Sequence, residues 1–493
     1  GTADATINGV TVGKGASSVA NNTALGVNAL TNNTTGNDNL AVGSLALENN
    51  TTGNHNVALG RKALNTNTAN SNNTAIGSHA LNVSTANNNT AVGYHGLFAN
   101  TTGNSNTAVG VKALDANTTA SNNTAVGYDS LGANTTGSEN VAVGANALET
   151  NTTGYRNVAV GRSALDNNTT GFENTAVGKS SLQLNTSGVK NAAFGMNSLD
   201  ANTTGSENTA LGHNALSSNT TASYNVAVGR SALAFNTTGT SNVALGVFAL
   251  DANTTANNNT AIGYNALTDN TTGLRNTGIG QEALSNNTTA NNNVAVGAQT
   301  LLANTTGADN TAVGAFALDA NTGGGSLTAV GKNALGANTS GSHSVAVGKE
   351  ALLRNTTGSS NTAVGNFALY QNTTGTNNVA FGKDALLSNT TAGDNAAFGK
   401  DALRVNTTGN NNTAVGRSAL YSNTTGANNV AIGFQALDAN TTDGQSVAVG
   451  SQALTSATTG ALTAVGYNAL RDNTSGAYNT ALGYQALLVN TTA

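Results

Sequence analysis

The residues of this chain that could do chemistry are few and scattered. Five histidines occur in 493 residues. The chain contains an internal repeat, and each histidine stands at a position whose residue type changes from copy to copy. They are His55, His79, His95, His213 and His343. We expect all five side chains to lie far apart in the fold. The sequence therefore predicts no catalytic centre, no metal site and no enzyme.

Acidic residues and glycines give no stronger signal for a cofactor. Glu139, Glu173, Glu207 and Asp38 do not form the dense aspartate pattern of calcium-binding repeats. Cysteine is absent, which excludes disulfides and thiolate zinc sites. No glycine stands in the strand-loop-helix context that holds phosphate groups. We therefore expect no bound cofactor.

Tyrosine is the side chain best suited to contact a partner. Candidate contacts to a cell-surface receptor or glycan stand at variable positions: Tyr94, Tyr128, Tyr155, Tyr224, Tyr264 and Tyr467. The formal net charge is −5 and there is no basic run, which argues against nucleic acid as a partner. No apolar stretch approaches the ~18 residues of a membrane helix, so membrane insertion is not expected.

An internal repeat organises the chain and decides where these side chains can lie. The motif Asn-Thr-Ala-Val-Gly recurs from Gly26 to Gly483 in about 28 copies, and its closing glycines keep an almost constant period of seventeen. The two exceptions are steps that are one residue shorter, from Gly77 to Gly93 and from Gly450 to Gly466. One unit reads N-T-A-V-G-x-x-A-L-x-x-N-T-T-G-x-x. A fixed period of this length is typical of solenoids.

The unit predicts β structure. Asn, Thr and Gly are poor helix formers and no stripe of period 3.6 exists, which disfavours a helical repeat. We expect two short strands, in the Asn-Thr-Ala-Val and Ala-Leu parts, and a surface turn at Asn-Thr-Thr-Gly, where both short steps have lost a residue. Coils one strand spacing of ~4.8 Å apart give a rod roughly 130 Å long. The predicted fold is an all-β parallel β-solenoid of about 28 coils.

Apolar residues occupy both faces of the predicted strands. Because side chains alternate along a strand, Val141 and Val143 should share one face and Ala142 the other. By the same reasoning Ala147 and Leu148 should point to opposite faces. Either alanine packs inside a thin coil with the larger residues partly exposed, or one apolar row is covered by another chain. We expect a homo-oligomer, because an uncovered apolar stripe is an association site, and either row could face the partner.

Two recurrent asparagines predict ladders of stacked side chains. One precedes the strand threonine, as Asn56 does, and one precedes the threonine pair, as Asn100 does. Stacked amides can donate and accept along a column. The alternative is that asparagine suits left-handed turns. Threonine pairs such as Thr101 and Thr102 are expected to stack into two columns as well. Regular threonine arrays bind ice in some solenoids, although a turn next to glycine is not expected to be flat.

These residues resemble two related groups of fibre proteins. NTAVGxxAL resembles the head repeats of YadA-like trimeric adhesins, whose S-V-A-I-G-x-x-A pattern builds a left-handed β-roll in a trimer. The longer unit, as in TAVGYNALRDNTSG, is similar to repeats of phage tail fibres and bacterial surface fibres, and residues 6–26 resemble the entry to such repeats. The unit of this chain is longer than the adhesin head repeat. A left-handed β-roll and a homotrimer are what the resemblance implies.

The repeat predicts a mechanical role outside the cell, at a cell surface or on a virion. The first hypothesis is a structural fibre or shaft that acts as a rigid spacer. The alternative is an adhesin that binds a receptor or glycan through its variable turns, and the third is an ice-binding solenoid. Residues 1–21 break the period and are expected to form a cap or junction. Residues 22–493 form the rod, which is expected to continue or to stack end to end beyond the C-terminus.

Overall fold

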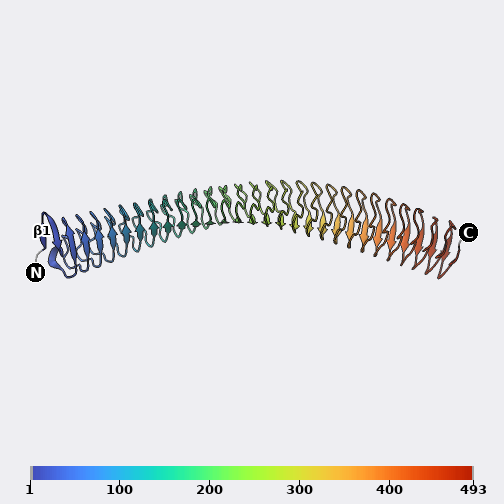
Figure 1. Cartoon of the computed structure of the whole chain (residues 1–493), viewed down its shortest axis with the longest axis horizontal. Coiled ribbons are helices and arrows are strands. Elements are labelled where there is room, and N and C mark those ends of the chain that lie inside the picture. The colour runs from blue at the N-terminus through green and yellow to red at the C-terminus, as the bar shows by residue number, and fades with distance from the viewer. Residues whose placement is uncertain (1–3, 491–493) are drawn as a thin grey trace. The chain divides into compact units, whose positions relative to one another are not determined.

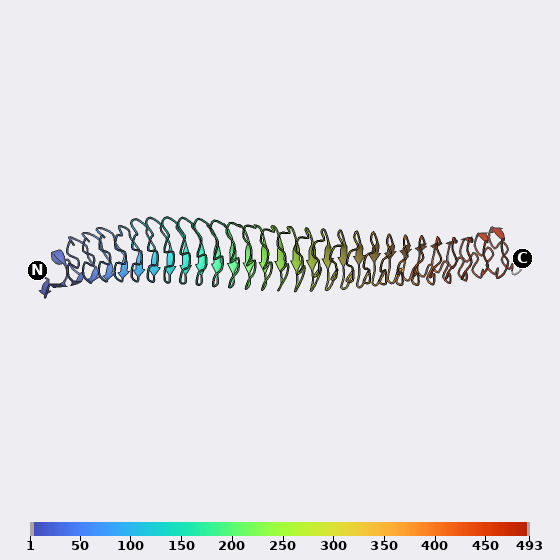
Figure 2. The same ribbon diagram turned by 90° about the horizontal axis from the view of Figure 1, so that it is seen from above.

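The computed structural model describes residues 4–490 and divides the chain into two compact units, Gly1–Leu245 and Gly246–Ala493. Both units are parallel β-solenoids, and together they hold about 27 turns. Within each unit, the strand of one coil lies beside the strand of the next (Figure 1), and the view from above shows the same succession (Figure 2). The prediction of an all-β parallel β-solenoid is confirmed.

The first unit begins with β1 (Ala5–Ile7), β2 (Val10–Gly13) and a short 3-10 turn η1 (Ala16–Ser18). Its parallel strands are β3 (Thr23–Gly26), β4 (Leu40–Val42), β5 (Val57–Leu59), β6 (Thr74–Ile76), β7 (Thr90–Val92), β8 (Thr107–Val109), β9 (Thr124–Val126), β10 (Val141–Val143), β11 (Val158–Val160), β12 (Thr175–Val177), β13 (Ala192–Phe194), β14 (Thr209–Leu211), β15 (Val226–Val228) and β16 (Val243–Leu245).

The second unit contains only parallel strands among its described residues. They are β17 (Thr260–Ile262), β18 (Thr277–Ile279), β19 (Val294–Val296), β20 (Thr311–Val313), β21 (Thr328–Val330), β22 (Val345–Val347), β23 (Thr362–Val364), β24 (Val379–Phe381), β25 (Ala396–Phe398), β26 (Thr413–Val415), β27 (Val430–Ile432), β28 (Val447–Val449), β29 (Thr463–Val465) and β30 (Thr480–Leu482).

Equivalent positions stack on one another in register. Val141 of β10 pairs with Val158 of β11, and Ala142 pairs with Ala159. The ladder continues around the coil outside the strand, where the N–H of Leu148 donates to the carbonyl of Ala164 at 3.0 Å. Each coil is therefore held to its neighbours by backbone hydrogen bonds around most of its circumference, which is how a short unit without a core of its own becomes stable.

Each coil contains one strand, not the two that the sequence predicted. The Ala-Leu part is a run of turns, because Asn146 and Leu148 have φ values of +59° and +52°. Residues in the left-handed region cannot continue a strand. The leucines equivalent to Leu148 in the other coils have the same positive φ, although a left-handed φ is costly for a non-glycine residue. The second predicted strand is wrong for this reason.

The interior of the coil is built from two alanines and one leucine. Ala142, Ala147 and Leu148 are all fully buried. The strand alternates as predicted, with Ala142 inside and Val143 outside. The expectation that Ala147 and Leu148 point to opposite faces is wrong, because the positive φ of Leu148 turns its side chain to the same interior as its neighbour.

The glycine that ends each strand is required by close packing between coils. Gly144 has a φ of +139°, and a Cβ atom there would lie 2.5 Å from the carbonyl oxygen of Gly161 in the next coil. Real Cβ atoms do not approach a backbone oxygen so closely. This explains why the position is glycine in every copy of the repeat.

Two buried columns of asparagine run along the coils of each unit. In the first, Nδ2 of Asn134 donates to Oδ1 of Asn117 in the preceding coil at 2.9 Å and to the carbonyl of Gly137 at 3.0 Å. In the second, Oδ1 of Asn123 accepts the backbone N–H of Asn140 at 2.9 Å. These hydrogen bonds confirm the predicted ladder. None of these asparagines has a positive φ, so they do not act as left-handed turn residues.

The N-terminal segment differs from the repeats. β1 and β2 form an antiparallel hairpin, and β2 pairs antiparallel with β3. The hairpin lies inside the predicted cap or junction at 1–21 and occupies the edge of β3 that no preceding coil covers. A paired edge no longer offers unpaired backbone groups to another chain.

Candidate functional site

In each unit the outward face of the strands carries an apolar row, here called the outer row. It is formed in the first unit by Leu25 of β3 and the third residue of β4 to β16, and in the second unit by the third residue of β17 to β30. Val143 and Val347 are typical members, 37% and 36% exposed. Within the described residues every member is Val, Leu, Ile or Phe. A solvated position should accept polar residues over so many copies, as the turns do, and this one accepts none.

A second surface is the ridge, defined as the residue directly after each strand-ending glycine. The ridge is mostly exposed and varies from coil to coil. Four of the predicted tyrosine contacts stand on it, at Tyr94, Tyr128, Tyr264 and Tyr467. Tyr155 and Tyr224 belong to the opposite turn, after the threonine pair. The structure thus divides the six candidates between two surfaces and does not gather them into one site.

Individual tyrosines contact aromatic neighbours that the sequence did not single out. The rings of Tyr155 and Phe172 stack at 4.8 Å, and those of Tyr467 and Tyr484 at 5.5 Å. In both pairs the partner stands one full repeat later, at the same place in the next coil. Reading the sequence at the period of the repeat would have found them.

Two of the five histidines lie together, against expectation. The rings of His79 and His95 are 5.5 Å apart, because both stand second after the strand-ending glycine on consecutive coils. The ring of His95 stacks on Phe98, and its Nδ1 lies 3.7 Å from Oδ1 of Asp115. Burial, helped by the positive field of His95, lowers the pKa of His79. The prediction that all five histidines are far apart is wrong for this pair.

This aromatic and histidine cluster does not bring together a set of metal ligands. Across residues 4–490, no group of three or more His, Cys, Asp or Glu side chains is arranged to hold a metal ion. Over the same described stretch, no helix has the length and apolarity to cross a membrane.

In six coils, three in each unit, a half-buried aspartate directly follows the buried leucine. Desolvation by burial raises the pKa of each of these carboxyl groups. They are Asp115, Asp166, Asp200, Asp251, Asp319 and Asp438. Each stands at the same position of a different coil, so these carboxyl groups do not form a local acid-base centre.

The ridge of the second unit carries cations on successive coils. They are Lys332, Lys349, Lys383, Lys400 and Arg417, with Asn366 at the one interruption. The sequence showed no basic run, because one or two whole repeats separate each cation from the next along the chain. Folding brings them into one line, here called the basic ridge.

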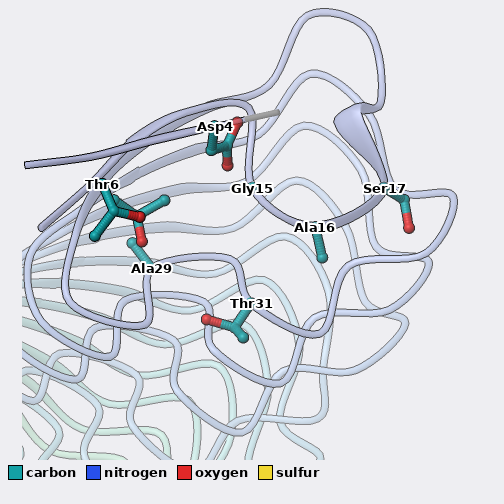
Figure 3. Close-up of a pocket in the computed structure, with 8 residues that line it drawn as sticks. Asp4, Thr6, Gly15, Ala16, Ser17, Ala29 and Thr31 are labelled. Atoms are coloured by element: carbon teal, nitrogen blue, oxygen red, sulfur yellow. The ribbon is translucent and has the colours of Figure 1, made fainter. Parts of the chain in front are cut away.

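Two surface hollows accompany these features. One of about 360 Å³ lies under the N-terminal hairpin, and Asp4, Thr6, Ser17 and Thr31 are among the residues around it (Figure 3). The carboxylate of Asp4 accepts the backbone N–H of Lys14 at 2.6 Å, so it stabilises the hairpin. The other, of about 370 Å³, lies beside the basic ridge in the second unit.

No family model matches the chain, and no curated protein matches it.

Proposed function

We propose that this chain is a structural fibre, a rigid non-catalytic spacer in which the outer row packs against further copies of the same chain. The observation that carries the proposal is the composition of the outer row. It stays apolar in every described coil although members such as Leu59 and Phe398 are 44% and 41% exposed in the single chain. An apolar stripe of this regularity favours a covered surface.

A second copy of the chain is the partner that fits this stripe best. Another solenoid with the same repeat presents its own apolar row at the same spacing, so equivalent side chains meet coil by coil. The resemblance to trimeric adhesin heads and tail fibres makes a left-handed homotrimer outside the cell, on a cell surface or on a virion, the form that we propose.

The ladders support the mechanical part of the proposal. Backbone hydrogen bonds and the asparagine columns run from coil to coil, so a pull along the stack loads many bonds in parallel. Adding a coil lengthens the stack without new chemistry, because each coil contacts only its neighbours. A spacer needs this combination of stiffness and adjustable reach.

The proposal is tested by particle length and by mass. A variant lacking four complete repeats should appear in electron micrographs as a fibre about 19 Å shorter. Light scattering should give a multiple of the chain mass of 48.6 kDa. Particles of unchanged length would contradict the spacer, and a monomer at micromolar concentration would contradict packing through the outer row.

An adhesin is the second candidate, and the exposed aromatic and charged residues of the ridge favour it. Tyr94, Tyr128 and Lys400 stand at the same position of different coils, where substitution leaves the interior untouched. A ridge of this kind can carry a binding surface while the rest of the coil remains a scaffold.

A further inference from the structure

The basic ridge is a line of side chains in register. The N–H of Glu350 donates to the carbonyl of Lys332 at 2.9 Å, that of Asp401 to Lys383 at 3.0 Å, and that of Ser418 to Lys400 at 3.0 Å. The cations of neighbouring coils are therefore separated by one strand spacing, ~4.8 Å. Like charges this close repel one another, so cations on neighbouring coils do not stabilise the solenoid, and stability does not explain why they are there.

The cations stand further out than the acids beside them. The side chains of Lys349, Lys383 and Lys400 are 55%, 58% and 55% exposed. The carboxylates of the following residues, Glu350, Asp384 and Asp401, lie 3.3, 3.9 and 3.6 Å from these lysines but are only 18%, 14% and 16% exposed. An approaching ligand meets the ammonium groups first and the carboxylates beneath them.

Aromatic rings hold some of these cations in place. Nζ of Lys349 lies 5.6 Å from the ring centre of Phe367, and the guanidinium of Arg417 lies 5.5 Å from that of Phe434. Such contacts are attractive and reduce the freedom that a long side chain must lose on binding.

The hollow beside the ridge adds an apolar corner. Phe367 and Tyr370 meet edge to face at 5.5 Å, and both line the hollow together with Lys383, Asp384 and Arg404. The guanidinium of Arg404 donates to the hydroxyl of Tyr421 at 3.0 Å. A ring face, a carboxylate and two cations thus surround one cavity.

We propose that the basic ridge binds a linear acidic polysaccharide, one whose sugars carry carboxylate or sulfate groups, lying along the stack. The rise of a coil is close to the length of one sugar in an extended polysaccharide, so successive anions can meet successive cations. The recessed carboxylates can accept hydrogen bonds from sugar hydroxyls, and the ring of Phe367 or Tyr370 can pack against the C–H face of a sugar.

Nucleic acid fits this surface less well. The phosphates of one strand advance by ~3.4 Å per nucleotide along the axis of a duplex and wind around it, which does not match a straight row of cations at the coil spacing. The carboxylates of Glu350, Asp384 and Asp401 would lie close to a dense row of phosphates and offer them no hydrogen-bond donor. The inference adds a ligand to the chain and does not depend on the spacer role, since a single unpaired rod would carry the same ridge.

The experiment measures binding of the full chain to immobilised polygalacturonate and chondroitin sulfate, with neutral dextran and duplex DNA as comparison surfaces. The test variant is Lys383→Gln, Lys400→Gln, Arg417→Gln. The matched control is Arg61→Gln, Arg162→Gln, Lys179→Gln, which removes three charges from the ridge of the first unit, where no run of this length exists. Circular dichroism confirms that both variants fold.

We expect binding to at least one acidic polysaccharide, about tenfold weaker for the test variant and unchanged for the control. Polygalacturonate carries carboxylates alone and chondroitin sulfate carries both groups, so binding to chondroitin sulfate only would show that sulfate is required. Equal loss in both variants, DNA binding as tight as polysaccharide binding, or no binding to either acidic polysaccharide would overturn the proposal. A third variant, Glu350→Gln, Asp384→Asn, Asp401→Asn, should lower the preference for polysaccharide over DNA, and an unchanged preference would refute the role of the carboxylates.

Discussion

Nδ2 of Asn440 donates to Oδ1 of Asn423 at 2.7 Å, and the ladder stops there because Ala457 stands where the next asparagine is due. Oδ1 of Asn440 is buried without a hydrogen-bond partner. The same happens at Asn67, whose next coil has Ser84 at this position. Both interruptions fall in the two coils that are one residue short, so the short coils are weak points of the column.

Ala457→Asn is therefore expected to stabilise the second unit. The new Nδ2 can donate to Oδ1 of Asn440, and the gain should be about 1 kcal/mol, typical of one hydrogen bond that satisfies a buried acceptor. Urea unfolding measures the effect. The matched variant Ala453→Asn places the same amide at a buried alanine position outside the column and should destabilise. An equal or lower stability for Ala457→Asn would contradict the ladder account.

Leu148→Ala should destabilise the first unit by about 2–5 kcal/mol, because it removes a fully buried side chain and leaves a cavity between coils. Val143→Ala, in the same coil, removes a side chain that is 37% exposed and should cost clearly less. Thermal or urea unfolding of the two variants provides the comparison. Similar losses would mean that the leucine is not the main contact of the interior.

Gly144→Ala should destabilise strongly, since the position combines a φ of +139° with the close approach of the next coil. Gly323→Ala is the control. A Cβ at Gly323 would meet nothing nearer than Oγ1 of Thr306 at 3.6 Å, so the change should be neutral or slightly stabilising. Folded yield and melting temperature report on both variants, and a tolerated alanine at Gly144 would argue against the close packing described above.

The triple variant Val143→Gln, Val160→Gln, Val177→Gln changes the outer row on three successive coils. If this row packs against another copy, the variant should dissociate towards a mass of 48.6 kDa in light scattering. The control Thr153→Gln, Thr170→Gln, Ser187→Gln alters exposed turn residues of the same coils and should leave the mass unchanged. An oligomer that survives the first variant and not the second would place the interface at the turns.

The aspartates after the buried leucines predict an unusual response to pH. Burial raises the pKa of Asp251, Asp319 and Asp438, so the folded state binds protons more tightly than the unfolded state. Their contribution to stability is fully present below the unfolded pKa of ~3.9 and is lost as pH rises through the folded pKa. Through these groups, the melting temperature should therefore rise as pH falls from their folded pKa towards the unfolded value of ~3.9.

Replacing these three residues by asparagine isolates the effect. The variant should be more stable than the wild type at pH 7, since three half-buried charges are removed, and its melting temperature should depend less on pH. Asp472, whose pKa Arg471 lowers through a hydrogen bond, acts in the opposite direction and is unchanged in both proteins. A wild type that loses stability steadily below pH 7, with the variant behaving alike, would contradict the assignment.

Much of the fold could be predicted because stacking turns a sequence period into a structural one. The constant step of the repeat predicted parallel coils in register, and recurrent asparagines such as Asn117 and Asn134 predicted the ladder. The path of the chain within a coil could not be predicted in full. A leucine with positive φ is costly in isolation, and only the hydrogen bond from Leu148 to Ala164 and the packing around it make the conformation favourable.

The surfaces were harder to predict than the interior. The sequence predicted that the outer row is apolar. It left two alternatives for which face of the strand lies inside the coil, and the burial of Ala142 decides between them. The proximity of His79 and His95, and the alignment of Lys383 with Lys400, depend on contacts between residues one repeat apart. Chemistry that arises across coils is invisible to any search for local motifs. The homotrimer and its handedness remain predictions.

The direction of the asparagine column has a consequence for how such a chain can change over generations. In every recorded rung of each unit the Nδ2 of one coil donates towards the coil before it, as Asn151 does to Asn134. Every coil with asparagine at this position therefore offers the same donor on one side and the same acceptor on the other; Ser84 and Ala457 mark the two coils that do not. Copying or deleting a whole repeat that carries this asparagine leaves each new rung of the column identical to the old ones, so length is a heritable trait that unequal recombination can adjust in single steps.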